Sequence, residues 1–132
     1  MNVYLRLLWA YLKIGLFGFG GGYAMLSLIQ SEVVDAGWIS NQTFTDIVAI
    51  SQMTPGPIGI NSATYIGYVV GGGVLGSLVA TLAVVFPPFV PVLMVGHYIA
   101  RHRDSAVIRG AFAGLRPVVV GLIASAALLL MN

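Results

Sequence analysis

One short stretch combines prolines, glycines and hydrogen-bond donors, and its residue types are suited to binding an anion. It reads Met53-Thr54-Pro55-Gly56-Pro57-Ile58-Gly59-Ile60-Asn61-Ser62-Ala63-Thr64. Pro55 and Pro57 disfavour a helix that continues from the preceding residues, whereas Pro57 suits the first turn of a new helix. The first N–H groups of a helix lack intrahelical acceptors and lie at the positive end of its dipole. The sequence therefore predicts a helix start at Ile58 that can bind an anion.

Uncharged donors surround this helix start. They are Gln52, Thr54, Asn61, Ser62 and Thr64. Such side chains suit an oxyanion that is bound by hydrogen bonds and not by a strong ion pair with a charged side chain. In the alternative interpretation, Thr54 caps a helix and Asn61 forms hydrogen bonds between helices.

A second break is expected at a run of glycines. Gly20, Gly21 and Gly22 precede Tyr23, and glycine at this density interrupts a helix or lets another backbone approach closely. Secondary transporters use discontinuous helices whose N-termini face an anionic substrate. We therefore predict one shared, water-accessible pocket near the membrane midplane. Its predicted residues are Gly20, Gly21, Gly22, Tyr23, Gln52, Thr54, Gly56, Ile58, Asn61, Ser62, Thr64 and Arg116. The alternative is that both breaks are packing kinks.

Few charged side chains are candidates for function. Arg116 begins an apolar segment, where an arginine is costly unless it is paired, faces a ligand or extends to the membrane surface. Glu32 is predicted to form a salt bridge or to carry a proton for coupling. His97 and His102 have no carboxylate partner that would argue for a metal, so neither a metal nor a cofactor is expected.

The composition indicates a membrane protein. The chain has 132 residues, of which 58% are hydrophobic and only 8% charged, and no charged residue lies between Asp46 and Arg101. Soluble domains carry about 25% charged residues. The uncharged run could supply about two spans of roughly 20 residues each. The absence of cysteine excludes disulfides.

Several classes of function are disfavoured by the sequence. The sequence has no basic stripe with interleaved aromatic residues, so nucleic acid is not expected as a partner. The glycine run lacks the lysine and hydroxyl residue of a phosphate-binding loop, and no nucleophile lies near a base in an arguable order. The sequence therefore does not favour an enzyme or an ATPase.

The expected elements are all helical. We expect helices over residues 2–19, 23–34, 41–53, 58–70 and 74–100, a short helix over 106–115 and a last helix over 117–131. Ser40 is the expected N-cap of the third helix. Three arginines between residues 101 and 109 predict a cytoplasmic connection. Gly59, Ala63 and Gly67 recur every four residues and predict a face for close packing, by which the chain would pair with a like module.

These motifs together resemble the chromate ion transporter (CHR) family. The matching segments are Phe17 to Leu26, Gly37-Trp38-Ile39-Ser40 with Phe44, Gln52 to Pro57, Asn61 to Tyr68, and Gly114-Leu115-Arg116-Pro117. The resemblance implies an oxyanion permease of prokaryotic plasma membranes that exports chromate or handles a related anion such as sulfate. It also implies single-module chains that work in pairs, as homodimers or heterodimers. Residues 1–132 correspond to one such module, and the resemblance leaves open whether a C-terminal helical stretch is missing.

The sequence thus predicts an all-α, multi-pass membrane protein with discontinuous helices that forms one module of a two-module secondary transporter. Its expected partners are chromate or a related oxyanion, the lipid bilayer and a second module. The alternative is a membrane subunit that does not transport and contributes helices to a larger complex. A third hypothesis is an intramembrane enzyme, but the sequence contains no candidate catalytic residues for it.

Overall fold

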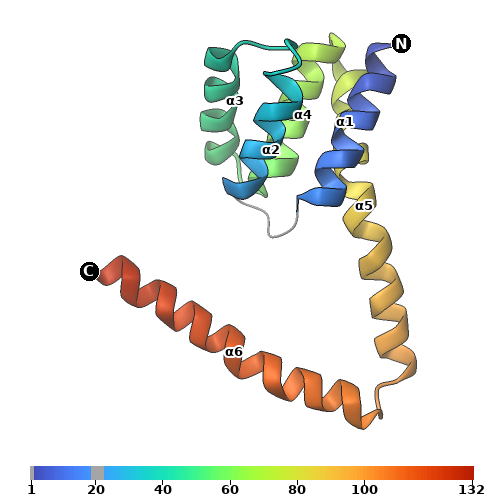
Figure 1. Cartoon of the computed structure of the whole chain (residues 1–132), viewed down its shortest axis with the longest axis vertical. Coiled ribbons are helices and arrows are strands. Elements are labelled where there is room, and N and C mark those ends of the chain that lie inside the picture. The colour runs from blue at the N-terminus through green and yellow to red at the C-terminus, as the bar shows by residue number, and fades with distance from the viewer. Residues whose placement is uncertain (1, 19–22) are drawn as a thin grey trace. The chain divides into compact units, whose positions relative to one another are not determined.

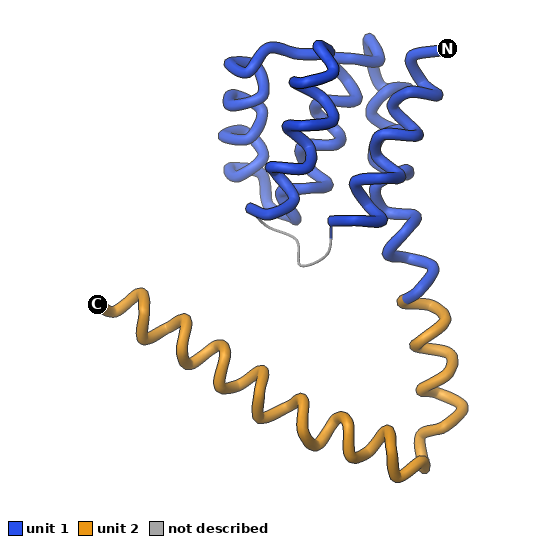
Figure 2. The backbone as a smooth tube through the Cα atoms, viewed as in Figure 1, with its two compact units in different colours: residues 1–91 blue, residues 92–132 orange. Residues whose placement is uncertain are grey.

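The computed structural model describes residues 2–18 and 23–132, and all regular structure in these residues is helical. The helices are α1 (Val3–Phe17), α2 (Tyr23–Val33), α3 (Asn41–Met53), α4 (Ile58–Gly71), α5 (Val74–Arg101) and α6 (Ala106–Met131) (Figure 1). The chain divides into unit 1, residues 1–91, and unit 2, residues 92–132 (Figure 2). The predicted all-α class is confirmed, whereas discontinuous helices and a two-module arrangement stay predictions.

Unit 1 is built from two pairs of antiparallel helices and the first part of α5. Helix α2 runs back alongside α1, and α4 runs back alongside α3, so that both pairs reverse direction at the same end of the unit (Figure 1). The starts of α2 and α4, which the sequence predicted to share a pocket, therefore lie at one end of unit 1. Gly20, Gly21 and Gly22 lie outside the described residues.

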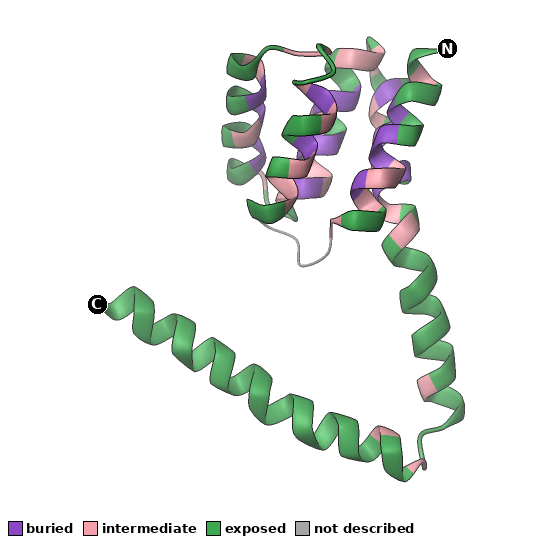
Figure 3. Ribbon diagram, viewed as in Figure 1, coloured by how far each residue is buried: buried purple, intermediate pink, exposed green. Residues whose placement is uncertain are grey.

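The core of unit 1 lies between these helices (Figure 3). Each helix contributes apolar side chains at helical spacing, as expected for amphipathic helices that bury one face. The buried set is Leu7, Tyr11 and Ile14 from α1, Ile29 and Val33 from α2, Phe44 and Ile47 from α3, Ala63 and Ile66 from α4, and Ala80, Ala83 and Val84 from α5.

Helix α3 begins and ends where its sequence signals predicted. The Ser40 side chain accepts a hydrogen bond from the backbone N–H of Thr43, which satisfies one of the free donors at the helix start. At the other end, the backbone N–H of Thr54 donates to the carbonyl of Ile50. Helix α4 then starts at Ile58, after the predicted break.

The small-residue face of α4 packs inside unit 1, which corrects the expectation that it contacts a second module. Ala63 is fully buried, and Gly59 and Gly67 are buried beside it. A Cβ on Gly59 would collide with the sulfur of Met25, and one on Gly67 would collide with the backbone oxygen of Gly76 on α5. Close contact between helices was predicted correctly, but its partners are α2 and α5 of the same chain.

Unit 2 contains the end of α5 and all of α6, and the side chains of α6 are almost all exposed (Figure 3). Helices α5 and α6 are both long and apolar enough to cross a membrane. The sequence predicted two helices between residues 106 and 131, but α6 is a single helix with Pro117 inside it. Proline is tolerated within helices of membrane proteins, because the freed backbone group can find another partner there.

Candidate functional site

The start of α4 carries backbone donors that no side chain caps. Pro57 occupies the N-cap position, and no side-chain hydrogen bond caps this end of α4 among the described residues. The first intrahelical bond runs from the N–H of Asn61 to the carbonyl of Pro57. The N–H groups of Ile58, Gly59 and Ile60 precede it and have no acceptor within the helix. By contrast, Asn2 and Ser40 cap α1 and α3. The start of α4 therefore offers free donors at the positive end of a helix dipole.

These donors lie beside a cavity of about 460 Å³, which we call the α4 cavity. Its walls come from α2, from the start of α4 and from the middle of α5. The lining residues are Met25, Gly56, Pro57, Ile58, Gly59, Ile60, Val84, Val85 and Pro88. The volume falls within the range of small-ligand sites, roughly 300–1,000 Å³. Because its walls are mostly apolar, the polar groups available to a ligand are chiefly those of the backbone.

The predicted polar side chains next to this helix start are engaged inside the chain. The Asn61 amide nitrogen donates to the carbonyls of Ser51 (3.2 Å) and Thr54 (3.1 Å), which ties α4 to the end of α3. The Thr54 hydroxyl donates to the carbonyl of Ile50 (3.0 Å) and lies 3.4 Å from the hydroxyl of Tyr65. In this structure, both side chains hold the α3–α4 turn in place.

Ser62 and Thr64 also use their hydroxyl groups within the helices. The buried Ser62 hydroxyl donates to the carbonyl of Gly59 at 2.9 Å. The Thr64 hydroxyl donates to the carbonyl of Ile60 and lies 2.8 Å from the hydroxyl of Thr81 on α5. Neither residue lines the α4 cavity, so their predicted contact with an anion stays a prediction.

The remaining predicted residues are distributed unevenly. Gly56 and Ile58 line the α4 cavity, whereas Gln52 and Tyr23 are exposed outside its lining. Arg116 belongs to α6 in unit 2. Met25, Val84, Val85 and Pro88 line the cavity but were not anticipated. No motif marks these four residues, because apolar side chains on α2 and α5 are equally expected from core packing.

Glu32 forms the salt bridge that was one of its two predicted roles. Its two carboxylate oxygens lie 3.0 and 2.8 Å from the ammonium group of Lys13. Both side chains are half-buried, and the pair joins α1 to α2. A role of Glu32 in proton coupling stays a prediction.

Taken together, the described residues include two helices that are long and apolar enough to cross a membrane and a cavity that is lined by the start of α4, where no side chain caps the helix. The sequence pattern of the family described as "Chromate transporter" matches residues 5–132. The chain belongs to this family. The expected resemblance is thereby confirmed.

Relatives of the chain include an uncharacterised transporter and chromate transport proteins. The chain is 36% identical over 120 residues to "Uncharacterized transporter YwrA" of Bacillus subtilis, covering 90% of this chain and 66% of the relative. It is 31% identical over 123 residues to the "Chromate transport protein" of Cupriavidus metallidurans, covering 92% of this chain and 30% of the relative. It is 33% identical over 112 residues to the "Chromate transport protein" of Pseudomonas aeruginosa, covering 85% and 26%.

The chain thus spans about two thirds of YwrA and less than one third of either chromate transport protein. No solved structure matches it.

Proposed function

We propose that the chain is one module of a secondary transporter that moves an oxyanion across a prokaryotic plasma membrane. Chromate, exported from the cell, is the first candidate substrate, and sulfate is the related alternative. Membership of the chromate transporter family supports an anion as cargo. Two modules, identical or related, would form the working transporter.

The observation that carries this proposal is the uncapped start of α4 at a cavity of about 460 Å³. An oxyanion in this cavity would accept hydrogen bonds from the N–H groups of Ile58, Gly59 and Ile60 and would lie at the positive end of the dipole. In hydrocarbon, donors without a partner are costly, so an anion, or water in its absence, stabilises this end of the helix. The donors are neutral, which favours release as well as binding.

The other predicted residues have defined places in this proposal. Asn61 and Thr54 position the helix start by holding the α3–α4 turn, and Gly56 lets the turn pass close to Asn61 with a φ of 138°. The proposed site further includes Gly20, Gly21, Gly22, Tyr23, Gln52, Ser62 and Thr64 as residues that contact the anion at some stage of transport. Arg116 lines a different pocket, in unit 2, and is not part of this proposed site.

Reconstitution of the purified chain into liposomes tests the function. We expect uptake of labelled chromate or sulfate that changes when pH or membrane potential is varied, and none in liposomes without protein. If the chain alone gives no flux but a second module restores it, a heterodimer is the working unit. No flux with either would favour a subunit that does not transport.

The site is tested separately by Ile58→Pro, which deletes one free N–H. Proline fits the first turn of a helix, and the preceding Pro57, with φ −63° and ψ 128°, is compatible with a following proline. Losing one hydrogen bond to a charged group weakens anion binding by about ten- to a hundredfold. Ile58→Val keeps the N–H and is expected to bind as the parent does. Equal binding by both variants would place the anion elsewhere.

A further inference from the structure

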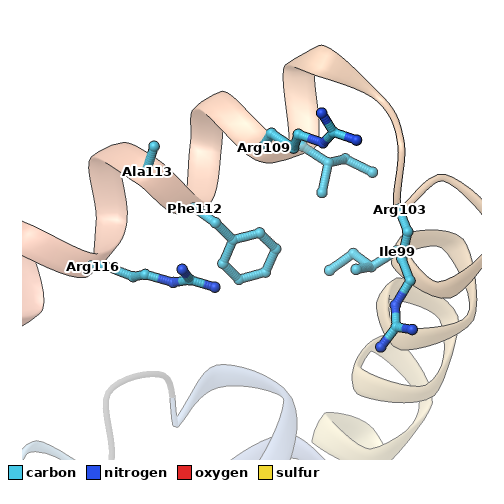
Figure 4. Close-up of a pocket in the computed structure, with 7 residues that line it drawn as sticks. Ile99, Arg103, Arg109, Phe112, Ala113 and Arg116 are labelled. Carbon is cyan, nitrogen blue, oxygen red and sulfur yellow. The ribbon is translucent and has the colours of Figure 1, made fainter.

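A second cavity lies within unit 2 and combines three arginines with apolar walls. It has a volume of about 420 Å³, and we call it the arginine pocket (Figure 4). The lining residues are Ile99, Arg103, Ile108, Arg109, Phe112, Ala113 and Arg116. Arg109, Phe112 and Arg116 share one face of α6, because residues three, four and seven positions apart lie above one another on a helix.

The arginine pocket lies between the C-terminal end of α5 and the N-terminal part of α6, where the arginines of these two apolar helices are found. Ile99 is in the last turn of α5, and Arg109 is in the first turn of α6. Arg116 lies further along α6, about 15 Å from its start at 1.5 Å per residue. Its guanidinium is 6.0 Å from the centre of the Phe112 ring, one turn nearer the start of α6 (Figure 4). The charge of Arg116 is thus directed back towards the charged end of the helix.

The positive charge of this pocket is only partly balanced. The Arg109 guanidinium lies 3.4 Å from a carboxylate oxygen of Asp104, a fully exposed side chain. Within residues 2–18 and 23–132, no carboxylate lies within 4.0 Å of Arg103 or Arg116. An arginine near hydrocarbon needs a partner or water. An anion with an apolar body fits both the charge and the walls formed by Ile99, Ile108 and Phe112.

We propose that the arginine pocket binds the phosphate group of an anionic phospholipid, with the acyl chains against the apolar walls. Basic pockets at the ends of membrane-spanning helices are suited to such head groups. A free oxyanion would satisfy the guanidinium groups but would leave the apolar walls uncovered. This site is distinct from the α4 cavity, and its occupant is a structural lipid that fixes the α5–α6 turn at the membrane surface.

Native mass spectrometry of the full chain in detergent tests this proposal. Delipidated protein is titrated with phosphatidylglycerol and with phosphatidylcholine that carries the same acyl chains. We expect phosphatidylglycerol to bind more tightly, and Arg103→Gln to weaken its binding about fivefold. Arg101→Gln is the matched control, because it removes the same charge two residues away, at the last residue of α5, which lies outside the pocket lining. It is expected to leave binding unchanged.

Three results would overturn the lipid assignment. Equal binding of the two lipids would show that the pocket does not distinguish an anionic head group from a zwitterionic one, although both carry a phosphate. Equal losses in Arg101→Gln and Arg103→Gln would show that only the net charge matters. Displacement of phosphatidylglycerol by inorganic phosphate at millimolar concentration would identify a site for soluble anions. Since no transport is measured, these outcomes are independent of the proposed chromate flux.

Discussion

At the scale of single residues, the donors of the α3–α4 turn divide into two groups. The side-chain donors of Asn61 and Thr54 are satisfied by carbonyls at the end of α3, whereas backbone donors at the start of α4 are free of side-chain caps. The sequence could predict that hydrogen-bond donors gather at this turn, because the residue types alone show it. It could not predict which donors remain available to a ligand, since that depends on which carbonyl groups at the end of α3 lie within reach of the side chains.

Asn61→Leu is therefore expected to destabilise the protein. The substitution removes both hydrogen bonds of the amide and leaves the carbonyls of Ser51 and Thr54 without this donor. Leaving a buried acceptor unsatisfied costs about 1–3 kcal/mol. Thermal unfolding in detergent measures the loss. Gln52→Leu is the control, because this exposed side chain has no recorded partner within the described residues. An unchanged melting temperature in Asn61→Leu would show that the turn does not depend on the amide.

The ion pair between Lys13 and Glu32 gives a second residue-scale prediction. Because the pair is half-buried and bidentate, we expect a coupling energy of about 1 kcal/mol in a double-mutant cycle of Lys13→Met and Glu32→Gln. Unfolding of the four proteins measures this coupling. A coupling of zero, together with loss of pH-dependent transport in Glu32→Gln, would instead favour a role in proton coupling.

At the scale of helices, the packing of α4 on α5 depends on the absence of side chains. A Cβ on Gly67 would collide with the backbone oxygen of Gly76 and lie 2.8 Å from the Cβ of Ala80. A backbone atom cannot move aside as the end of a flexible side chain can. The close approach of these helices therefore requires glycine at position 67.

Gly67→Ala is expected to lower the free energy of unfolding by about 1–3 kcal/mol or more, the typical cost of overpacking. Gly96→Ala is the matched control on α5, because a Cβ there would meet nothing within 4 Å. Alanine at an exposed helical position is expected to be neutral or slightly stabilising. If the two variants unfold at the same temperature, helices α4 and α5 do not pack as closely as described.

The helices themselves were largely predictable, and their contacts were not. Ser40 and Pro57 are local signals, so the boundaries of α3 and the start of α4 could be predicted from them. The small-residue face of α4 also carries a clear signal, but spacing alone does not say whether its partner is the same chain or another copy. The predicted helix boundary at Pro117 was wrong, because α6 continues through this proline. The free-energy cost of a proline inside a helix depends on its surroundings, which the local sequence does not contain.

At the scale of the whole molecule, α5 has the length and charge distribution of a membrane-spanning helix. Its 28 residues correspond to about 42 Å, more than the roughly 30 Å hydrocarbon core of a bilayer. Glycines precede α5, whereas three arginines lie around its other end: Arg101 is its last residue, Arg103 follows in the connection, and Arg109 is in the first turn of α6. Short connections rich in arginine stay on the cytoplasmic side. The two ends of α5 are therefore expected on opposite sides of the membrane.

Cysteine labelling tests this orientation without a background signal, because the chain contains no cysteine. Ser105→Cys places a thiol in the arginine-rich connection, and Val74→Cys places one at the exposed start of α5. With a membrane-impermeant maleimide, Val74→Cys is expected to react in intact cells, and Ser105→Cys only in inverted vesicles. Labelling of Ser105→Cys from outside would reverse the orientation, and labelling of both from one side would mean that α5 does not cross. Labelling of Ser105→Cys from outside would also remove the arginine pocket from the cytoplasmic surface, where anionic phospholipids are enriched.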